Sequence, residues 1–312
     1  MTRIHCLGIL VVDALSGPLE RYPEPGVNPQ AVTKTLRFMP GGGAANTPSA
    51  LARMGLRPAV FSKVGNDPNG AFLLRELAQC GVDTSGIRVS DSDATPFTFV
   101  GVHPDGDRTF IHTPGANLTV TFDDFDLERL LLTDFLVYQD LWVLPRMDGA
   151  PGAAVLAEAQ RRGVTTFLDE CWGLGPNRDA FEAMAPHCDY LLPSLDDLRA
   201  IYPGTSAEEM ADYLLGLGAR AAVLKMGAEG CLVAQGERRV RVPALPAQVV
   251  DTTGAGDCWD AGFIAGLAYG EDIVTAARIG CACAAFCIEA LGGSTGVPDY
   301  PTVLHRATNA SL

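Results

Sequence analysis

Short apolar runs alternate with amphipathic segments along most of the 312-residue chain. The apolar runs predict buried strands at residues 4–12, 57–64, 135–138, 165–168, 190–192 and 221–225. The amphipathic segments predict helices at residues 44–54, 71–80, 153–162, 180–185, 195–201 and 206–217. Strands that alternate with helices are typical of βαβ units. We therefore expect a doubly wound α/β fold, with a mainly parallel sheet and helices on both of its faces.

Two stretches interrupt this alternation. Residues 14–38 are rich in Pro and Gly and too polar for a core. Residues 96–114 hold two runs of alternating apolar and polar positions on either side of Asp105-Gly106, which is the pattern of a β-hairpin. We interpret both stretches as parts of a small β lid over a site at the strand ends. An edge hairpin that only covers the core is the alternative.

Composition narrows the possible functions. The chain carries 23 Lys and Arg against 37 Asp and Glu, a formal net charge of −14 at pH 7. This acidic balance argues against a nucleic-acid partner, which needs cations for its phosphates, and against docking on an anionic membrane. Hydrophobic residues make up 47% of the chain, enough for a large core. No repeat stands out, and we expect a single domain over residues 1–312.

The cysteines and the first residues of the chain indicate the cellular compartment in which the protein works. Nine cysteines are present, and none forms the paired pattern of a zinc site. The first residues run directly into a strand-like segment without the layout of a signal peptide. Charged residues interrupt every apolar stretch near the C-terminus before it is long enough to cross a bilayer. These observations predict a cytoplasmic protein in a reducing environment.

The strongest chemical signal lies at residues 249–263. A strand-like end meets the glycine-rich turn 251–257 (Asp-Thr-Thr-Gly-Ala-Gly-Asp), which leads into an apolar helix. Gly254 and Gly256 let backbone N–H groups point into a concave space, and the helix dipole adds a positive end. This combination predicts an anion site suited to a phosphate, with the Asp257 carboxylate beside it. The alternative for Asp257 is a plain helix cap.

Two further segments contain glycine-rich turns. Residues 40–55 place three glycines before a predicted helix, with Asn46 in its first turn. The side chain of Asn46 both donates and accepts hydrogen bonds, which suits a ligand rich in hydroxyl groups. A tight turn with a helix cap is the alternative. Residues 223–233 predict a strand, a glycine-bearing turn and a second strand, a pattern that a plain hairpin also explains.

Taken together, the three segments resemble the ribokinase-like carbohydrate kinases, also called the PfkB family. Residues 251–257 resemble the C-terminal signature of that family, and residues 41–46 with 51–55 resemble its N-terminal signature. The run Lys225-x-Gly227-x-x-Gly230 lies between them, in the expected order. The resemblance extends from residue 4 to residue 298. It implies a doubly wound sheet with a small β lid, which agrees with the pattern of apolar positions.

The resemblance also implies an activity. Family members transfer the γ-phosphoryl group of Mg-ATP to a hydroxymethyl group of a sugar or nucleoside. Asp257 matches the position of the catalytic base, and the backbone of Gly254, Ala255, Gly256 and Asp257 matches the anion hole. This chemistry fits the residues, because phosphoryl transfer depends mainly on positioning and charge neutralisation.

Further positions follow from the same resemblance. The acceptor pocket is implied to include Asp13, Gly42, Gly43 and Asn46. The nucleotide is implied to lie beside Ser194, Lys225, Gly227, Gly230, Thr253 and Cys281. Asp197 is implied to hold Mg²⁺ through water, and Asp251 and Thr253 match positions that help to bind a monovalent cation such as K⁺. Arg108, in the predicted hairpin, would either reach an acceptor from above the pocket or remain solvated.

The chain departs from the family pattern at three places. Ser194 and Asp197 stand where many members have Asn and Glu, so one amide contact is lost while the negative charge is kept. Cys281 stands where the helix on the adenine side often has Asn or His. Residues 169–172 (Asp-Glu-Cys-Trp) lack the Asp-x-Asn-x-Arg pattern of many fructokinases and ketodeoxygluconate kinases, which argues against those two substrates.

Several functions remain open at this point. The leading hypothesis is an ATP-dependent kinase of a monosaccharide or sugar derivative. A nucleoside kinase of the same fold and a non-catalytic sugar- or nucleotide-binding regulatory protein are the alternatives. A Rossmann dehydrogenase is excluded, because no Gly-x-Gly-x-x-Gly follows the first predicted strand. Lid-to-lid homodimers occur in the resembled family, so such a dimer is an expectation here.

Overall fold

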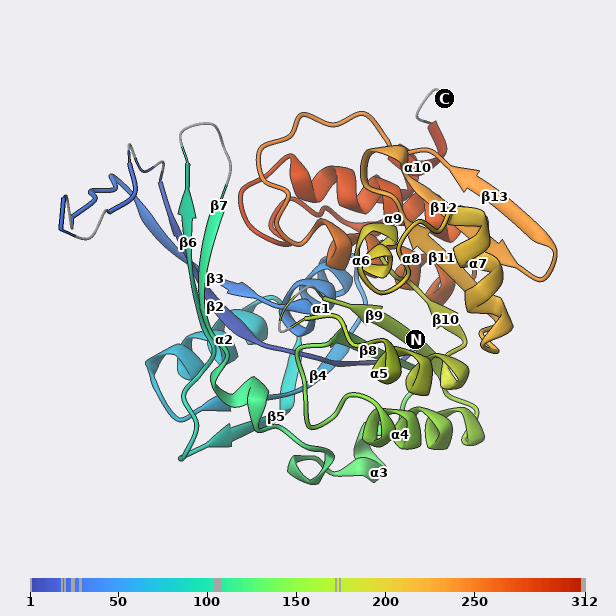
Figure 1. Cartoon of the computed structure of the whole chain (residues 1–312), viewed down its shortest axis with the longest axis horizontal. Coiled ribbons are helices and arrows are strands. Elements are labelled where there is room, and N and C mark those ends of the chain that lie inside the picture. The colour runs from blue at the N-terminus through green and yellow to red at the C-terminus, as the bar shows by residue number, and fades with distance from the viewer. Residues whose placement is uncertain are drawn as a thin grey trace.

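The computed structural model contains two sheets (Figure 1). It describes residues 2–309 apart from residues 18, 20, 24–25, 28–29, 104–107, 172 and 174, and it leaves the side chain of Arg108 undescribed. The larger sheet has the strand order β13-β12-β11-β10-β9-β8-β1-β4-β5, in which the strands from β11 to β5 are parallel. Its strands are β1 (Ile4–Leu7), β4 (Pro58–Gly65), β5 (Asp83–Ser90), β8 (Phe135–Leu141), β9 (Thr165–Glu170), β10 (Tyr190–Leu191), β11 (Ala221–Lys225), β12 (Cys231–Gln235) and β13 (Arg238–Val242).

Helices cover both faces of this sheet. Those with at least seven residues are α1 (Gly43–Arg53), α2 (Pro68–Gln79), α4 (Ala150–Arg161), α5 (Arg178–Met184), α6 (Leu195–Ile201), α7 (Ala207–Gly216), α8 (Ala255–Ala268), α9 (Ile273–Ile288) and α10 (Tyr300–Asn309). The short helix α3 (Leu127–Leu130) precedes β8. The expectation of a mainly parallel sheet with helices on both faces is confirmed, and most predicted elements lie within a few residues of the observed ones.

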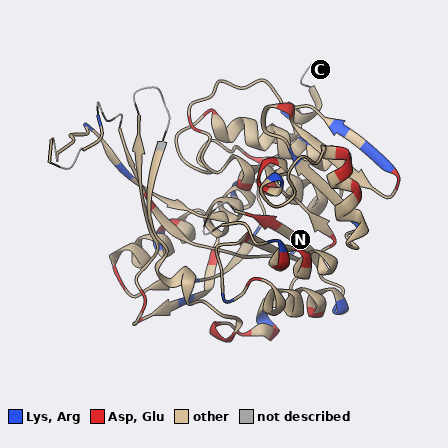
Figure 2. Cartoon of the chain, viewed as in Figure 1, with Lys and Arg blue, Asp and Glu red and all other residues tan. Residues whose placement is uncertain are grey.

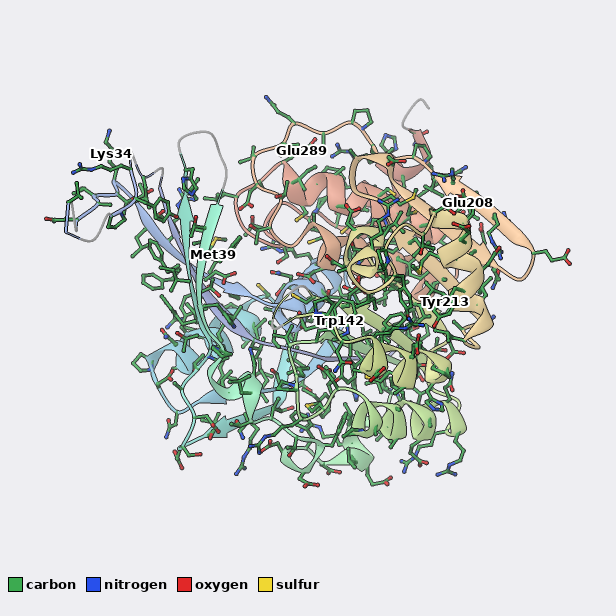
Figure 3. The ribbon with its side chains drawn as sticks, viewed as in Figure 1. Lys34, Met39, Trp142, Glu208, Tyr213 and Glu289 are labelled. Atoms are coloured by element: carbon green, nitrogen blue, oxygen red, sulfur yellow. The ribbon has the colours of Figure 1, made fainter. Side chains whose placement is uncertain are left out.

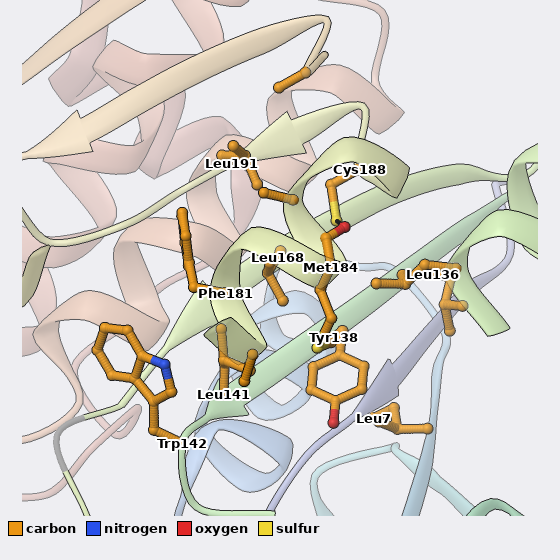
Figure 4. Packing of buried hydrophobic residues seen from close by; sticks show 14 of the residues in the cluster. Leu7, Leu136, Tyr138, Leu141, Trp142, Leu168, Phe181, Met184, Cys188 and Leu191 are labelled. Atoms are coloured by element: carbon orange, nitrogen blue, oxygen red, sulfur yellow. Dashed lines mark hydrogen bonds between the residues drawn. The ribbon is translucent and has the colours of Figure 1, made fainter. Parts of the chain in front are cut away.

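Alternation along the strands builds the two core layers. In β8, Val137 packs in the layer of α1, α8 and α9, while its neighbours Leu136 and Tyr138 pack in the layer of α4 to α7. Figure 4 shows this second layer, with Leu136, Tyr138 and Leu168 of the sheet near Phe181 and Met184 of α5. A strand that is buried on both faces needs apolar residues at every position, which explains the continuous apolar runs in the sequence.

The smaller sheet forms the lid. Its strand order is β3-β2-β6-β7, with β2 (Val11–Ser16), β3 (Leu36–Gly41), β6 (Phe97–Val102) and β7 (Arg108–Thr113). These strands project away from the main sheet on the left of Figure 1. Both stretches that interrupt the alternation of strands and helices contribute to this sheet. The turn predicted at Asp105-Gly106 lies outside the described residues.

The single strand predicted at residues 4–12 is wrong. The chain instead divides this apolar run between β1 of the main sheet and β2 of the lid. Gly8 lies at the crossing, where a Cβ atom would come within 2.5 Å of Asp140 Oδ2. The apolar pattern continues into β2 because Leu10 and Val12 pack in a third core cluster with Val60 and Leu73. Because residues on both sides of Gly8 are buried, the pattern of apolar residues shows no break where the chain passes from the main sheet to the lid.

Two arginines on the β13 edge of the main sheet form ion pairs. Arg239 and Arg241 of β13 form ion pairs with Asp212 and Glu208 of α7, and Figure 2 shows these charges side by side. The charges of two of the three arginines of β13 are therefore balanced by acidic neighbours, in line with the acidic balance of the whole chain. Among the described helices, none combines the length and the apolar character that crossing a membrane requires.

Candidate active site

A large cavity opens at the carboxyl ends of the parallel strands. The chain continues from β1 to β4 and β5 on one side and to β8 to β11 on the other, so β1 and β8 form a topological switch point. Ligands of open α/β sheets bind beside such points. The cavity measures about 1190 Å³, enough for two small substrates. Of the residues that the sequence singles out, Asp13, Gly42, Gly43, Asn46, Ser194, Asp197, Lys225, Gly227, Gly230, Thr253, Gly254, Ala255, Gly256, Asp257 and Cys281 line it.

The N-terminus of α8 forms the floor of the cavity. Gly254 is the N-cap residue, with a φ of 72° that favours glycine, and its side-chain-free backbone packs against Gly293 and Asn46. Asp257 is the third residue of the helix and not its N-cap, and its carboxylate accepts a hydrogen bond from Asn46. The hypothesis that Asp257 is a plain N-cap is therefore wrong. The α8 N-terminus instead presents backbone N–H groups and the positive helix end to the cavity, beside a carboxylate.

Two residues of helix α1 hold Asp257 in place. The Asn46 side chain in α1 donates from Nδ2 to Asp257 Oδ2 at 2.8 Å, and Thr47 Oγ1 donates to the Asp257 carbonyl at 3.0 Å. Burial raises the pKa of Asp257, while the Asn46 hydrogen bond and the positive charge of Lys225 lower it. A base with a raised pKa accepts a proton more readily, provided that it is still ionised at the working pH.

Asp140, which the sequence analysis did not select, clamps two backbone segments at the end of the cavity next to α1. Its carboxylate accepts hydrogen bonds from the backbone N–H groups of Ile9 and Gly43, at 2.9 and 3.1 Å. Asp140 itself has a φ of 60°, a conformation that residues other than glycine rarely adopt. Such strain is typical of functional sites. Its signal in the sequence is its position, two residues after the predicted strand at residues 135–138.

The lid supplies the outer wall of the same end of the cavity. Asp13 lies within β2, paired with Thr98 of β6, which in turn pairs with His112 of β7. These three side chains and Phe110 line the cavity. Met39 of β3, shown near the root of the lid in Figure 3, packs directly on Gly292, so the lid also touches the loop behind the anion site. The side chain of Arg108 and all of Trp172 lie outside the described residues.

We predict that the affinity for the acceptor falls in acid through Asp13. Burial raises the pKa of Asp13 to about 6. The family resemblance implies that Asp13 binds acceptor hydroxyls: above that pH its carboxylate would accept their hydrogen bonds, and below it the charge is lost. The KM of the acceptor should therefore rise by up to about tenfold from pH 7 to pH 5 at saturating ATP, because the ionised fraction of a group with a pKa of about 6 falls about tenfold over that range and hydrogen bonds to charged groups contribute about 1.5–3 kcal/mol.

The control for this prediction is Asp13→Asn. This variant should have a high acceptor KM at every pH, without the rise between pH 7 and pH 5. An acceptor KM that rises in acid equally in the wild type and in Asp13→Asn would show that another group titrates.

The opposite end of the cavity is suited to a nucleotide. Lys225 ends β11, and Gly227 and Gly230 flank the short turn that follows it. A Cβ at Gly230 would lie 2.0 Å from the Val242 carbonyl oxygen, so the turn packs tightly on β13. Cys281 of α9 also lines this end, with its sulfur 3.4 Å from the Trp259 indole nitrogen. The cavity thus brings together residues that are far apart in the sequence.

Carboxylates gather between the two ends. Asp169 and Glu170 end β9, and Asp197 lies in the first turn of α6. The Glu170 carboxylate accepts a hydrogen bond from the Ser194 N–H at 2.6 Å. Burial, followed by the charge of Asp169, raises the pKa of Asp197. Within the described part of the chain, no group of three or more His, Cys, Asp or Glu side chains is arranged to hold a metal ion.

Asp251 joins two loops beneath the anion site. Its carboxylate accepts hydrogen bonds from the N–H groups of Thr253 at 2.8 Å and Gly292 at 2.9 Å, and the residue is 1% exposed. Asp251 does not line the cavity, whereas Thr253 does. The loop after α9 is therefore fastened to the glycine-rich turn that precedes α8.

Comparisons with known proteins agree with this geometry. The chain is 30% identical over 258 residues to an uncharacterized sugar kinase of Archaeoglobus fulgidus, covering 80% of this chain and 98% of the relative. It is 30% identical over 284 residues to an ATP-dependent ribose-1-phosphate kinase of Halopiger xanaduensis, covering 91% and 90%. The solved structure of Arabidopsis thaliana ribokinase with ribose and ATP superposes with a TM-score of 0.84 at 24% identity, covering 98% and 99% of the two chains.

The structural likeness shows that the fold is ribokinase-like. The model of the pfkB family carbohydrate kinases matches residues 1–300, nearly the whole chain. This protein is therefore a member of the pfkB family of carbohydrate kinases, a phosphotransferase with the ribokinase-like fold.

Proposed function

We propose that the enzyme transfers the γ-phosphoryl group of Mg-ATP to a hydroxymethyl group of a monosaccharide or sugar derivative. The acceptor binds between the lid and α1, and ATP binds along β11 and α9. The Asp257 carboxylate takes the proton from the acceptor hydroxyl. The acceptor oxygen forms a bond to the γ-phosphorus while the bond to the β-phosphate oxygen breaks, and ADP leaves with that electron pair.

One observation carries this proposal. The Asp257 carboxylate lies at the N-terminal end of α8 and lines one cavity with Asp13 and Asn46, which we propose as the acceptor wall, and with Lys225, which we propose as the nucleotide wall. A general base needs to lie within reach of the acceptor proton, and the transferred group needs donors that neutralise its charge. Here both requirements meet at the first turn of α8.

Two cations belong to the proposal. Mg²⁺ fits a site made chiefly of ATP phosphate oxygens and water, because it prefers such partners and keeps much of its hydration. The carboxylates of Asp197 and Glu170 face the same cavity and would hold the hydrating water. For K⁺, Asp251 and Thr253 with carbonyl groups of the loop 291–296 are the proposed partners. Asp251 supports this by fastening that loop to the anion site.

A nucleoside is the second candidate acceptor. The acceptor end of the cavity includes the rings of Phe110 and His112 and the aliphatic side chains of Ile9, Val11 and Val143. Apolar and aromatic walls of this kind suit the face of a nucleobase. A sugar bearing only hydroxyl groups would use the same end through Asp13 and Asn46.

The test is ADP release from Mg-ATP across pentoses, hexoses, sugar acids, sugar phosphates and nucleosides, with and without K⁺. We expect turnover with one acceptor class and a higher rate with K⁺ than with Na⁺. Turnover with nucleosides alone would select the second candidate. Binding of ATP without turnover on any acceptor would contradict the proposal and favour a regulatory binding protein.

We further propose that the enzyme acts in the cytoplasm and pairs with a second copy through its lid. Leu36, Phe38 and Ile111 of the lid are about half exposed or more, at 48%, 51% and 62%. Phe38 and Ile111 lie in one row across the sheet, where they align with Ala14 and Phe99. Light scattering should give twice the monomer mass, and Phe38→Asp combined with Ile111→Asp should give monomers.

A further inference from the structure

A buried lysine lies between two carboxylates beside the anion site. The Lys225 ammonium nitrogen is 2.7 Å from Asp169 Oδ1 and 3.1 Å from Asp260 Oδ1. The Lys225 side chain is 12% exposed, and those of Asp169 and Asp260 are 6% and 0% exposed. Burial alone would lower the pKa of Lys225, but the two carboxylates outweigh it and raise the pKa. The lysine is therefore a permanent cation.

This ammonium group faces the turn that would hold the phosphoryl group. A Cβ atom built on Gly256 would lie 3.6 Å from Lys225 Nζ. Lys225 also lines the cavity together with Gly254 to Asp257. The amine thus reaches the anion site from the side of the sheet, opposite the helix end.

Charge makes this cation important. The described side chains that line the cavity include the carboxylates of Asp13, Asp140, Asp169, Glu170, Asp197 and Asp257, and among them Lys225 is the sole Lys or Arg. ATP adds further negative charge to this region. In a low-dielectric site, a fixed cation next to the developing charge lowers the barrier more than it would in water.

Asp260 is the unexpected member of this group. It lies one turn after Asp257 in α8, a helix that is otherwise almost entirely apolar. One of its oxygens contacts Lys225, while Oδ2 is buried without a hydrogen-bond partner. A carboxylate in such a position costs stability, so its presence indicates a role other than stabilising the fold. Fixing the Lys225 amine is a use that the geometry provides.

We propose that Asp260, together with Asp169, is a positioning residue that holds the Lys225 ammonium beside the anion hole, where it neutralises charge on the transferred phosphoryl group. This inference rests on the proposed kinase reaction. Asp260 touches neither substrate and acts through Lys225. Burial raises the pKa of Asp257, and the positive charge of Lys225 acts in the opposite direction and lowers it.

The test is a double-mutant cycle on kcat. We expect Asp260→Asn to lower kcat by about tenfold with little change in the KM of ATP, because a small misplacement of a charged group lowers the rate of the chemical step more than it weakens substrate binding. Lys225→Met should lower kcat further, by about a hundredfold. In the Lys225→Met background, adding Asp260→Asn should change kcat by less than about twofold, because the two residues act as one unit. Additive effects would overturn the proposal.

A second readout uses the pH profile. Lys225→Met should move the acid limb of kcat/KM to higher pH, because Asp257 loses a nearby positive charge. Asp148→Asn is the matched control: Asp148 is a partly buried carboxylate, bonded to the Tyr138 hydroxyl at 2.9 Å and the Trp142 N–H at 3.0 Å, and is absent from the cavity lining. That variant should lose stability and keep both kcat and the acid limb.

Failure of the reaction and failure of this inference are distinguishable. If the wild type turns over no acceptor, the proposed reaction is wrong. The carboxyl resonance of Asp257, assigned by its loss in Asp257→Asn, can still be titrated in the unliganded protein. Lys225→Met should shift this titration to higher pH, and an unchanged titration would overturn the placement of Lys225. Lys225→Met leaves two buried carboxylates without their cation, which can impair folding. If that variant folds poorly, the double variant Lys225→Met with Asp260→Asn is titrated in its place, because it removes one of the two unpaired carboxylates.

Discussion

Replacing Asp257 with Asn should lower kcat by about a thousandfold while the affinity for Mg-ATP stays the same. The contribution of a general base is typically about 10²–10⁴-fold. Asn has the same shape as Asp, and its Oδ1 still accepts the hydrogen bond that Asn46 donates to Asp257 at 2.8 Å. The variant therefore keeps the local structure and loses only the capacity to take a proton. The measurement is kcat at saturating acceptor and ATP, with ATP affinity by calorimetry.

Asp272→Asn is the control for Asp257→Asn. Asp272 is the N-cap of the next helix, α9, with its carboxylate bonded to the Val274 N–H, and Asn caps helices about as well as Asp. Its kcat should match the wild type. Thermal unfolding of Asp257→Asn adds a check. Burial raises the pKa of Asp257, which means that burying its charge costs stability, and the neutral amide removes that cost, so the variant should not unfold at a lower temperature than the wild type. A kcat of Asp257→Asn within about threefold of wild type would exclude Asp257 as the base.

Replacing Gly254 with Ala should lower kcat by about a hundredfold or more and also destabilise the fold. The φ of 72° at Gly254 costs any other residue about 1–2 kcal/mol. The added Cβ would lie 2.8 Å from both the Cα atom and the carbonyl oxygen of Gly293, and 3.0 Å from Asn46 Nδ2. It would therefore displace the α8 N-terminus and the partner of Asp257 together. Loss of one anion-hole donor alone is typically about 10²–10³-fold in kcat.

Gly270→Ala separates backbone strain from catalysis. Gly270 also has a positive φ, of 93°, but a Cβ there would meet no atom within 4 Å, and the residue is absent from the cavity lining. This variant should lose stability through φ alone and keep its kcat. Equal losses of kcat in Gly254→Ala and Gly270→Ala would indicate that general destabilisation, and not the anion site, causes the effect.

Much of the active site follows from contiguous segments of the sequence. The glycine-rich turn and the apolar helix after it place Gly254 and Asp257 together whatever the rest of the fold does. The same holds for Gly42, Gly43 and Asn46 at the start of α1. These predictions needed only local geometry, because the end of a helix and the turn before it are built from neighbouring residues.

Contacts between distant segments could not be predicted in this way. Asn46 and Asp257 are separated by 211 positions, and Lys225 and Asp169 by 56. Which strand ends lie side by side depends on the order β11-β10-β9-β8-β1. The alternation of apolar and polar residues specifies each strand but not its neighbours. Asp140 and Asp260 were therefore missed, although each is an acidic residue at the end of, or within, an apolar segment.

The sequence by itself determined the α/β class, the order of most helices and strands, the lid segments and the glycine-rich turn at residues 251–257, because periodicity and short motifs act over a few residues. Only the tertiary structure decided where the apolar run at residues 4–12 passes from one sheet to the other. It alone brought the Asp140 clamp and the Lys225 ion pairs into one cavity with Asp257. Those features depend on strand order, and strand order is set by packing across the whole chain.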